Sequence, residues 1–407
     1  MSGRTVVVLA TLDTKGAEAG YLRHRIEALG GAVKLLDIGV VGAPSVAADV
    51  PREQVAEAGG RPLAELLDDP TREVAAPVMI AGATRLLLDL IAAGEAHAVL
   101  GIGGTQGTSA CTGVMQALPY GFPKLMVSTV ASGDTSPFVG IKDITMMFSV
   151  SDLMGLNPLT ERILANAAAA AWGMSLTEGI VATHGGDKPL VAMTNLGVLT
   201  AGAGHAVELL RAAGYDVVVF HAVGAGGRAM EQLMKEGVVG AVFDYALGEI
   251  ADEVFGGLRA GGPERLTVAG KLGLPQVICP GGAEHLGVFV EPEVVPEKYR
   301  HHQHVFHSPV IFVPRLKREE IVRVAEDICC RLQHTRGDAV LLLPLRGVGR
   351  YSVAGGPLHD PESDAAFFAA LKDGLPASIE VVEVDAGAED PAFVGEAVRR
   401  LIGLIER

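Results

Sequence analysis

Strand-like apolar runs and helix-like stretches alternate along this chain, and the alternation restricts it to an α/β fold with parallel sheets. Such folds combine Val/Ile/Leu-rich strands with glycine-rich turns, and here 52 residues are glycine while aromatic residues make up only 5% of the sequence. In the first half the predicted strands are Thr5–Ala10, Val33–Ile38, Ala98–Ile102, Lys124–Thr129 and Ile144–Val150, and the predicted helices are Gly16–Leu29, Thr71–Ala93 and Leu159–Met174.

The pattern breaks at a polar, glycine-rich segment, residues 183–189, and then restarts with a strand-like run at Leu190–Thr194. Residues 28–37 parallel residues 212–221, so each half opens with strand, loop, helix, glycine and strand. The length of 407 residues also favours two domains. We predict two Rossmann-like doubly wound domains, residues 1–183 and 184–407, with a ligand cleft between them. General α/β similarity is the alternative explanation of the repeat.

A glycine-rich segment, residues 101–109, follows the third predicted strand and precedes a helix-like stretch expected over residues 110–118. Glycine lets the backbone turn sharply and approach a ligand. The N–H groups at the start of the following helix attract an anion, most often a phosphate. A plain strand-to-helix turn is the alternative. The candidate phosphate-binding residues are Gly103, Gly104, Thr105, Gly107 and Thr108.

A second candidate segment follows the first predicted strand and contains Thr11, Asp13, Thr14 and Lys15. Two hydroxyls and a lysine at the carboxyl end of a strand can hold a phosphate, and the Asp13 carboxylate could hold Mg²⁺. The alternative is helix capping by Asp13 or Thr14. Neither glycine-containing segment is a Walker A motif, because Gly-Lys-Ser and Gly-Lys-Thr do not occur in the sequence.

The second half carries a G-x-G-x-x-A spacing at Gly224, Gly226, Gly227, Arg228 and Ala229. Asp244 follows the next strand-like run, where a dinucleotide site would place its ribose-binding acid. That fingerprint normally lies after the first strand of its unit, whereas here it follows the second. A general anion-binding loop, with Arg228 assisting, is therefore the favoured interpretation.

Imidazole and carboxylate groups gather near residue 300, with His301, His302, His304 and His307 following Glu284 and His285. Such groups could bind a transition metal, although the spacing matches no defined motif and histidine-rich loops are often simply solvated. His307 is expected at a strand entrance near the cleft. Since histidine titrates near neutral pH, His307 is an acid/base candidate, together with Asp244 and Glu284.

The overall composition excludes several classes of partner. The net charge is −15 without a basic block, which argues against nucleic acid, because that binding depends on neutralising phosphates. The uncharged run at residues 98–123 contains glycines and prolines unsuited to a membrane-spanning helix. The four cysteines match no zinc or redox spacing, and no signal peptide precedes the first strand. We expect a cytoplasmic protein without membrane contact.

Several segments together resemble an uncharacterised family typified by the ATP-binding N-terminal domain of tomato mosaic virus resistance protein-like proteins. The resemblance covers nearly the whole chain. The matching segments are residues 10–15, 101–104, 126–134, 143–147, 164–168, 220–222, 226–231, 307–309, 343–347 and 360–362.

The resemblance implies ATP binding in the first domain, for which we also expect Mg²⁺. It supports the two segments above and adds a third, with Ser128, Thr129, Ser132, Gly133 and Asp134. It also implies a homodimer and, because plant members carry a fused barrel domain similar to phosphoenolpyruvate-utilising enzymes, a separate barrel protein as a possible partner. An alanine-rich helix, Ile163–Trp172, is apolar on nearly every face and is expected in the core or at a subunit contact.

The chain departs from the family pattern in three places. The usual Gly-Gly-Ser-Gly-Gly-Thr is here residues 103–108, in which Gln106 replaces a glycine and puts close phosphate approach in doubt. A threonine-rich stretch is replaced by residues 244–249, and Ser308 stands where asparagine is usual. Two hypotheses remain: an enzyme acting on a small anionic metabolite in the interdomain cleft, or a non-catalytic nucleotide-binding module that regulates or partners the barrel protein.

Overall fold

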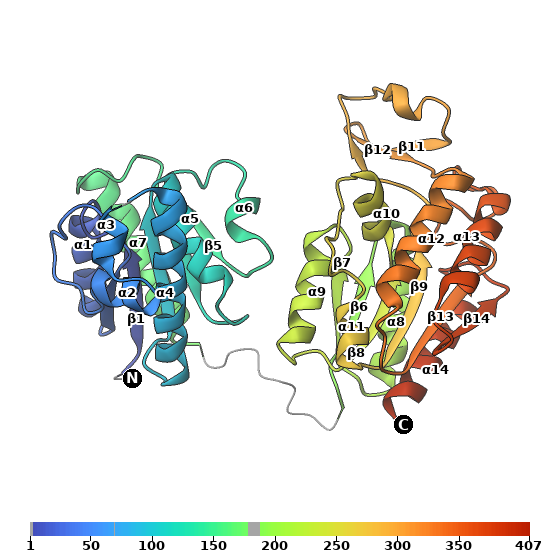
Figure 1. Ribbon diagram of the computed structural model, residues 1–407, viewed down its shortest axis with the longest axis horizontal. Helices are drawn as coiled ribbons and strands as arrows, with labels where there is room; N and C mark the ends of the chain where they lie inside the picture. The colour runs from blue at the N-terminus through green and yellow to red at the C-terminus, as the bar shows by residue number, and fades with distance from the viewer. Residues whose placement is uncertain (1–2, 69, 178–187) are drawn as a thin grey trace. The chain divides into compact units, whose positions relative to one another are not determined.

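The computed structural model describes residues 3–68, 70–177 and 188–407, which form two compact units, Met1–Val181 and Ala182–Arg407 (Figure 1). The predicted boundary at residue 183 lies outside the described residues. Each unit is an α/β domain, as the alternating sequence pattern predicts.

The N-terminal unit contains a five-stranded, fully parallel sheet with the order β2-β1-β3-β4-β5. Its central strands are buried on both faces, which explains their continuous Val/Ile/Leu runs. Val6 of the first strand pairs with Val33 on one side and with Ala98 on the other. The strands are β1 (Thr5–Ala10), β2 (Ala32–Asp37), β3 (Ala98–Gly103), β4 (Lys124–Ser128) and β5 (Thr145–Phe148).

Helices cover both faces of this sheet. One core packs Leu22 and Leu164, from α1 and α7, against Val8. The opposite core packs Met79 and Val114, from α4 and α5, against Leu9. The helices are α1 (Gly16–Ala28), α2 (Arg52–Ala58), α3 (Leu63–Asp68), α4 (Arg72–Ala92), α5 (Thr105–Gln116), α6 (Ser136–Val139) and α7 (Pro158–Ser175).

Two helices of this unit bear on earlier expectations. The alanine-rich helix α7 buries Ala167 and Ala168 against its own sheet but leaves Asn166 and Ala169 exposed, so it is not buried all round. Among the described residues one helix, α4, has a length and composition that could cross a membrane, over Glu73–Ala92. This helix packs against α2 and α5, and 28% of the segment is buried.

The C-terminal unit contains a six-stranded parallel sheet with the order β14-β13-β9-β8-β6-β7. Its first four strands in the chain follow the same spatial order as those of the N-terminal sheet, with the second strand outside the first and the third on the other side. The strands are β6 (Val191–Asn195), β7 (Val217–His221), β8 (Ala241–Ala246), β9 (Gln276–Gly281), β13 (Ala339–Pro344) and β14 (Ile379–Val384).

One face of this sheet packs on α8 and α14, and the other packs on the remaining helices. A small antiparallel sheet, ordered β10-β12-β11, is inserted between β9 and α12 and extends beyond α10 (Figure 1). The elements are η1 (Gly197–Leu199), α8 (Thr200–Ala212), α9 (Ala225–Lys235), α10 (Gly248–Phe255), α11 (Val268–Leu272), β10 (Val288–Phe289), η2 (Glu297–Tyr299), β11 (His304–Ser308), β12 (Ile311–Pro314), α12 (Arg318–Leu332), α13 (Pro361–Gly374) and α14 (Pro391–Ile405).

Candidate functional site

A pocket of about 790 Å³ lies at the carboxyl ends of β1, β2 and β3. After β1 the chain crosses to α1 on one face of the sheet, and after β3 it crosses to α5 on the other, so the two connections diverge. Open α/β sheets bind ligands at such a switch point. The polar lining includes Thr11, Asp13, Thr14, Lys15, Gly103, Gly104, Thr105, Gln106, Gly107 and Ser109, and the apolar lining includes Ile38, Val40, Val41, Ala75, Ala76, Met79 and Ile80.

The helix that follows β3 begins inside the glycine-rich segment, earlier than the sequence predicts. Helix α5 begins at Thr105 rather than at Ala110, with Gly104 as its extended N-cap residue. A Cβ on Gly103 would lie 2.7 Å from the Gly107 Cα, so glycine at residue 103 permits this close return of the chain. No side chain caps the helix and its first turn carries no acid. The N–H groups of its first turn therefore lie beside the pocket without a side-chain acceptor.

Two hydroxyls predicted to bind a ligand lie beneath this turn. Thr108 and Ser128 are both fully buried, and their hydroxyl oxygens are 2.7 Å apart. They hold the ends of α5 and β4 together and are not part of the pocket lining.

The rest of the predicted third segment also lies away from the lining. The Thr129 N–H donates to the Gly103 carbonyl at 3.3 Å, whereas Ser132, Gly133 and Asp134 are exposed in the turn after β4. Asp134 accepts the Ser136 N–H at 2.9 Å, and hydrogen bonding to Ser136 lowers the Asp134 pKa. The structure thus brings the first two segments together at the pocket and leaves the third outside its lining.

Asp13 does not cap α1, which removes the alternative explanation for this residue. The N-cap residue is Lys15, and no side chain caps the helix. Asp13 Oδ2 instead accepts the Gly42 N–H at 3.1 Å, while Oδ1 is buried without a hydrogen-bond partner. A Cβ on Gly42 would lie 2.8 Å from Oδ2, so only glycine lets this loop close over the carboxylate.

Lys15 lines the pocket, and its ammonium donates to the Leu153 carbonyl. This contact fixes the lysine near the carboxyl ends of β1 and β3, where it supplies positive charge. Close by, the hydroxyls of Thr11 and Thr14 are 2.8 Å apart and form a hydrogen bond with each other. Cationic and hydroxyl donors therefore border one side of the pocket.

In the C-terminal unit the predicted anion-binding loop already holds an internal anion. The N–H groups of Gly224 and Gly227 donate to Glu249 Oε1 at 2.6 and 3.1 Å. A Cβ on Gly226 would lie 1.9 Å from the His221 carbonyl oxygen, so this glycine serves close packing. Arg228 donates to the Gly224 carbonyl at 3.3 Å. The two N–H groups are thus not free for an external ligand.

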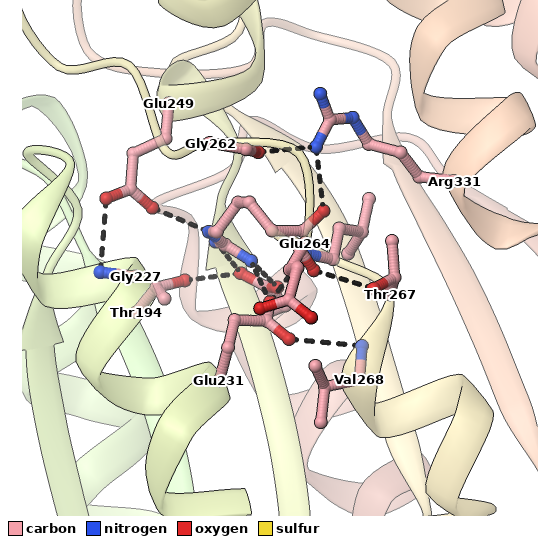
Figure 2. Close-up of polar contacts among 12 residues, drawn as sticks. Thr194, Gly227, Glu231, Glu249, Gly262, Glu264, Thr267, Val268 and Arg331 are labelled. Carbon is pink, nitrogen blue, oxygen red and sulfur yellow. Dashed lines mark hydrogen bonds and ion pairs between the residues drawn. The ribbon is translucent and has the colours of Figure 1, made fainter. Parts of the chain in front are cut away.

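Asp244, predicted as a catalytic acid/base, belongs to a buried charge network around Arg265. Figure 2 labels two other carboxylates of this network, Glu231 and Glu249. The fully buried Arg265 guanidinium binds both oxygens of Asp244 and also Glu249, at 2.6 Å. Thr194 donates its hydroxyl hydrogen to Asp244 at 2.8 Å. The Asp244 side chain is 2% exposed and is engaged by partners, so its position favours a structural role.

Glu231 completes this network. Its Oε1 lies 3.3 Å from Arg265 Nη1. The Glu231 carboxylate also accepts the Leu266 and Val268 N–H groups at 2.5 and 3.1 Å (Figure 2). Burial raises the pKa of Glu231 to about 7, although Arg265 attracts its charged form. Three carboxylates thus share one arginine.

The other two predicted catalytic residues, Glu284 and His307, share no hydrogen bond or ion pair. Glu284 is fully buried, with Oε1 3.2 Å from His285 Nδ1. Burial alone would raise its pKa, but His285 and Arg315 outweigh that effect and lower the pKa to about 2. His307 is exposed on β11, with Nδ1 3.5 Å from the Tyr351 hydroxyl.

The histidine cluster forms no metal centre in the part of the chain that the structure describes, where no three His, Cys, Asp or Glu side chains are placed to hold an ion. His302 instead lies 3.0 Å from Glu320, and His304 packs against Phe312.

Comparison with known proteins shows the family to which the chain belongs. Two models of an uncharacterised protein family, UPF0261, match: its N-terminal domain over residues 4–179 and its C-terminal domain over residues 188–405. This protein belongs to the UPF0261 family. A UPF0261 protein of Clostridium tetani is 37% identical over 405 residues, covering 99% of this chain and 100% of that protein. One from Rhizobium meliloti is 36% identical, covering 97% of this chain and 98% of its own.

A more distant relative is the tomato (Solanum lycopersicum) ToMV resistance protein Tm-1(GCR237), 32% identical over 270 residues, or 65% of this chain and 35% of that protein. Among solved structures, a putative UDP-N-acetylglucosamine 2-epimerase from Listeria monocytogenes aligns with 68% of this chain and 79% of its own, at 14% identity and a TM-score of 0.22. That likeness is too weak to support an argument about function.

Two features of this UPF0261 pocket were missed in the sequence. Asp37, at the end of β2, is 1% exposed and accepts the Leu12 and Gly39 N–H groups at 3.0 and 2.9 Å, so it ties two pocket loops together. Burial raises its pKa, and repulsion by Asp13 adds to the effect. The apolar wall on α4 was missed as well, because an apolar helix has the same pattern whether it faces a core or a pocket.

Proposed function

We propose that the N-terminal domain of this UPF0261 protein binds ATP in the pocket at the ends of β1, β2 and β3. The observation that carries the proposal is the start of α5, which has neither a side-chain cap nor an acid in its first turn and borders the pocket. Helix N-termini of this kind bind phosphate through N–H groups and the helix dipole.

The polar lining suits the triphosphate. A Cβ on Gly104 would make an ordinary van der Waals contact with Thr129 Oγ1, at 3.8 Å, and glycine leaves this position without a side chain, so an oxyanion can approach the backbone there. Lys15 provides a cation from the β1 side. Thr11, Thr14 and Thr105 provide hydroxyl donors around the same pocket.

The apolar lining suits the nucleoside. It comes from the segment after β2 and from α4, whereas the polar groups come mainly from the segments after β1 and β3. A ligand that joins a charged end to a flat, weakly polar end matches this division, because an apolar wall contributes to binding by burying ring surface. A nucleotide has that form.

The second candidate function, a non-catalytic binding module, is favoured by a specific observation in the C-terminal unit. Two of its three acid/base candidates, Asp244 and Glu284, are 2% and 0% exposed, and Asp244 is held by Arg265. In the N-terminal pocket the ionisable lining side chains are Asp13 and Lys15. A module that binds ATP and acts on a separate barrel protein fits this arrangement better than a hydrolase. The homodimer and the small anionic ligand stay predictions.

Calorimetric titration with ATP tests the proposal on the full chain. We expect binding by the wild type and at least tenfold weaker binding by Lys15→Ala, since a phosphate-contacting cation contributes on the order of 1–3 kcal/mol. Lys34→Ala is the control, because Lys34 pairs with Glu95 on the surface and is not part of the pocket lining. No heat of binding at millimolar ATP would refute the proposal, and equal affinities for wild type and Lys15→Ala would exclude Lys15 from the site.

A further inference from the structure

The β5–α7 connection, residues 149–157, is fastened to the start of α1 by two side chains. The Lys15 ammonium donates to the Leu153 carbonyl. Glu18, which is 1% exposed, accepts the Gly155 N–H on Oε1 at 2.9 Å. Both side chains come directly after the pocket-lining segment that follows β1. The connection is therefore tied to an element of the proposed ATP site.

The backbone of the β5–α7 connection is strained, and its side chains divide between core and solvent. Val150 has a φ of 63°, a left-handed conformation that is unfavourable for a β-branched residue and persists only where its surroundings impose it. Leu153 is fully buried against α1 and α7, whereas Val150 and Met154 are 62% and 82% exposed. The contacts with α1 thus help to hold a strained segment whose other apolar side chains face solvent.

Lys15 lies between two partners that belong to opposite faces of the sheet. Leu153 is part of the core that α1 and α7 form on one face. Ile38 and Met79, from the apolar lining of the pocket, are part of the core on the other face, with α4 and α5. Lys15 itself lines the pocket. Its ammonium is therefore held toward the α1 face, whereas a phosphate at the start of α5 would draw it toward the other.

We propose that ATP and the Leu153 carbonyl compete for the Lys15 ammonium, so that nucleotide binding releases the β5–α7 connection from α1. A phosphate offers the ammonium a full negative charge where Leu153 offers a neutral carbonyl, so the phosphate is the stronger partner. Release removes one of the contacts that hold the segment containing Val150. The inference rests on the proposed ATP binding and adds a conformational response to it.

This response changes the surface of the domain with its nucleotide state, because Val150 and Met154 lie in the released segment. A non-catalytic module that acts on another protein needs a response of this kind. Since couplings are reciprocal, whatever loosens the β5–α7 connection must also favour ATP binding by the same factor.

Hydrogen–deuterium exchange of the full chain, read by mass spectrometry, tests the release. The N–H groups of four alternate residues in the connection are hydrogen-bonded, so a peptide covering residues 149–157 reports its state; they are Ser149, Ser151, Leu153 and Gly155. We expect saturating ATP to speed exchange of this peptide by about threefold or more, the change that follows from the net loss of one hydrogen bond.

The Lys15→Ala variant should exchange this peptide at the faster rate without ATP, and ATP should not speed it further. Lys34→Ala is the matched control, because it also removes a lysine from this domain but breaks only a surface pair with Glu95. It should behave as wild type. Lys15→Met, which keeps most of the side-chain length and removes the ammonium, is the second variant should Lys15→Ala fold poorly.

Calorimetric titration of the same samples separates this inference from the proposed function. If wild type binds ATP and its 149–157 peptide exchanges no faster, the inference is overturned and the proposed function stands. If wild type binds no ATP, the proposed function fails, and the lysine variants alone decide whether Lys15 holds the connection. Faster exchange in Lys15→Ala than in Lys34→Ala would then support that hold, and equal exchange would refute it.

Discussion

The Gly227 N–H donates to Glu249 Oε1 at 3.1 Å, so the protein supplies its own anion to the first turn of α9. The first turn of α5 in the N-terminal domain contains no acid, and no side chain caps it. The two sheets share a strand order, yet one of these helix starts is closed by an internal carboxylate and the other faces a pocket. That contrast supports the proposal that phosphate binds in the N-terminal domain.

Charge substitution at Gln106 tests the role of α5. This exposed residue lies in the first turn of α5 and lines the pocket. We expect Gln106→Glu to weaken ATP binding several-fold and Gln106→Lys to strengthen it, because a charge near a helix N-terminus contributes about 0.3–1 kcal/mol. Calorimetry at low salt measures both, with Gln106→Ala as the size control. Affinities that do not follow the sign of the charge would place the phosphates elsewhere.

Removing Glu249 tests the internal anion of the C-terminal domain. Glu249→Ala leaves two buried N–H groups unpaired and deprives Arg265 of one partner. We expect it to lower the free energy of unfolding by about 3–5 kcal/mol, measured by urea denaturation. Glu264→Ala, which breaks an exposed pair with Lys235, should cost less than about 1 kcal/mol. Similar losses in the two variants would contradict the assignment.

The pH dependence of stability reports on Glu231. Its pKa is raised from 4.5 to about 7 in the folded protein, so the folded state holds this proton to higher pH than the unfolded state. The contribution to stability is present below about pH 4.5 and is lost as the pH rises through 7, a change on the order of 3 kcal/mol.

The pKa of Asp364 is raised to about 6, so this residue lowers stability with rising pH in the same direction as Glu231, but at lower pH. The pH dependence of the wild type must therefore be compared with that of a Glu231 variant. Denaturation of wild type and Glu231→Gln at about pH 6 and about pH 8 should show a smaller decrease for the variant. A wild-type slope that Glu231→Gln leaves unchanged would refute this origin.

The predicted homodimer is tested at α7. Light scattering should give twice the 42.2 kDa of one chain, and a mass near 42.2 kDa would refute the dimer. Ala168 is fully buried and Ala169 is exposed on the same helix, so Ala168→Glu is expected to destabilise the fold. A folded monomeric Ala169→Glu would place the contact on α7, whereas a folded dimer would place it elsewhere.

Sequence patterns predicted the strands well because each buried strand of a parallel sheet is a continuous apolar run. Strand β1 matches its predicted bounds of Thr5–Ala10, α1 differs from prediction by one residue at its C-terminal end, and α4 differs by one residue at each end. The start of α5 was misplaced because glycine lowers helix propensity, although the first turn of a helix tolerates it. The loops after β1 and β3 could each be recognised in the sequence. They lie at one pocket because parallel strands end at one edge of a sheet.

Other parts of the site depend on partners distant in the sequence. No local signal shows that Glu249 will fill the Gly224 loop, or that Arg265 will pair with Asp244, since each contact joins residues at least 21 positions apart. Asp37 was unremarkable as a strand-terminal acid until the fold placed it beside Asp13. Burial likewise separates Thr108 and Ser128 from hydroxyls that reach the pocket.

The most direct test of the central claim is photolabelling of the full chain with an ATP analogue that carries an azido group on the adenine ring, followed by peptide mapping. We predict that labelled peptides contain the segment after β2, residues 38–41, or the α4 segment, residues 75–80, and that excess ATP prevents the labelling. Labelling confined to the C-terminal domain, or labelling that excess ATP does not reduce, would contradict ATP binding in this pocket.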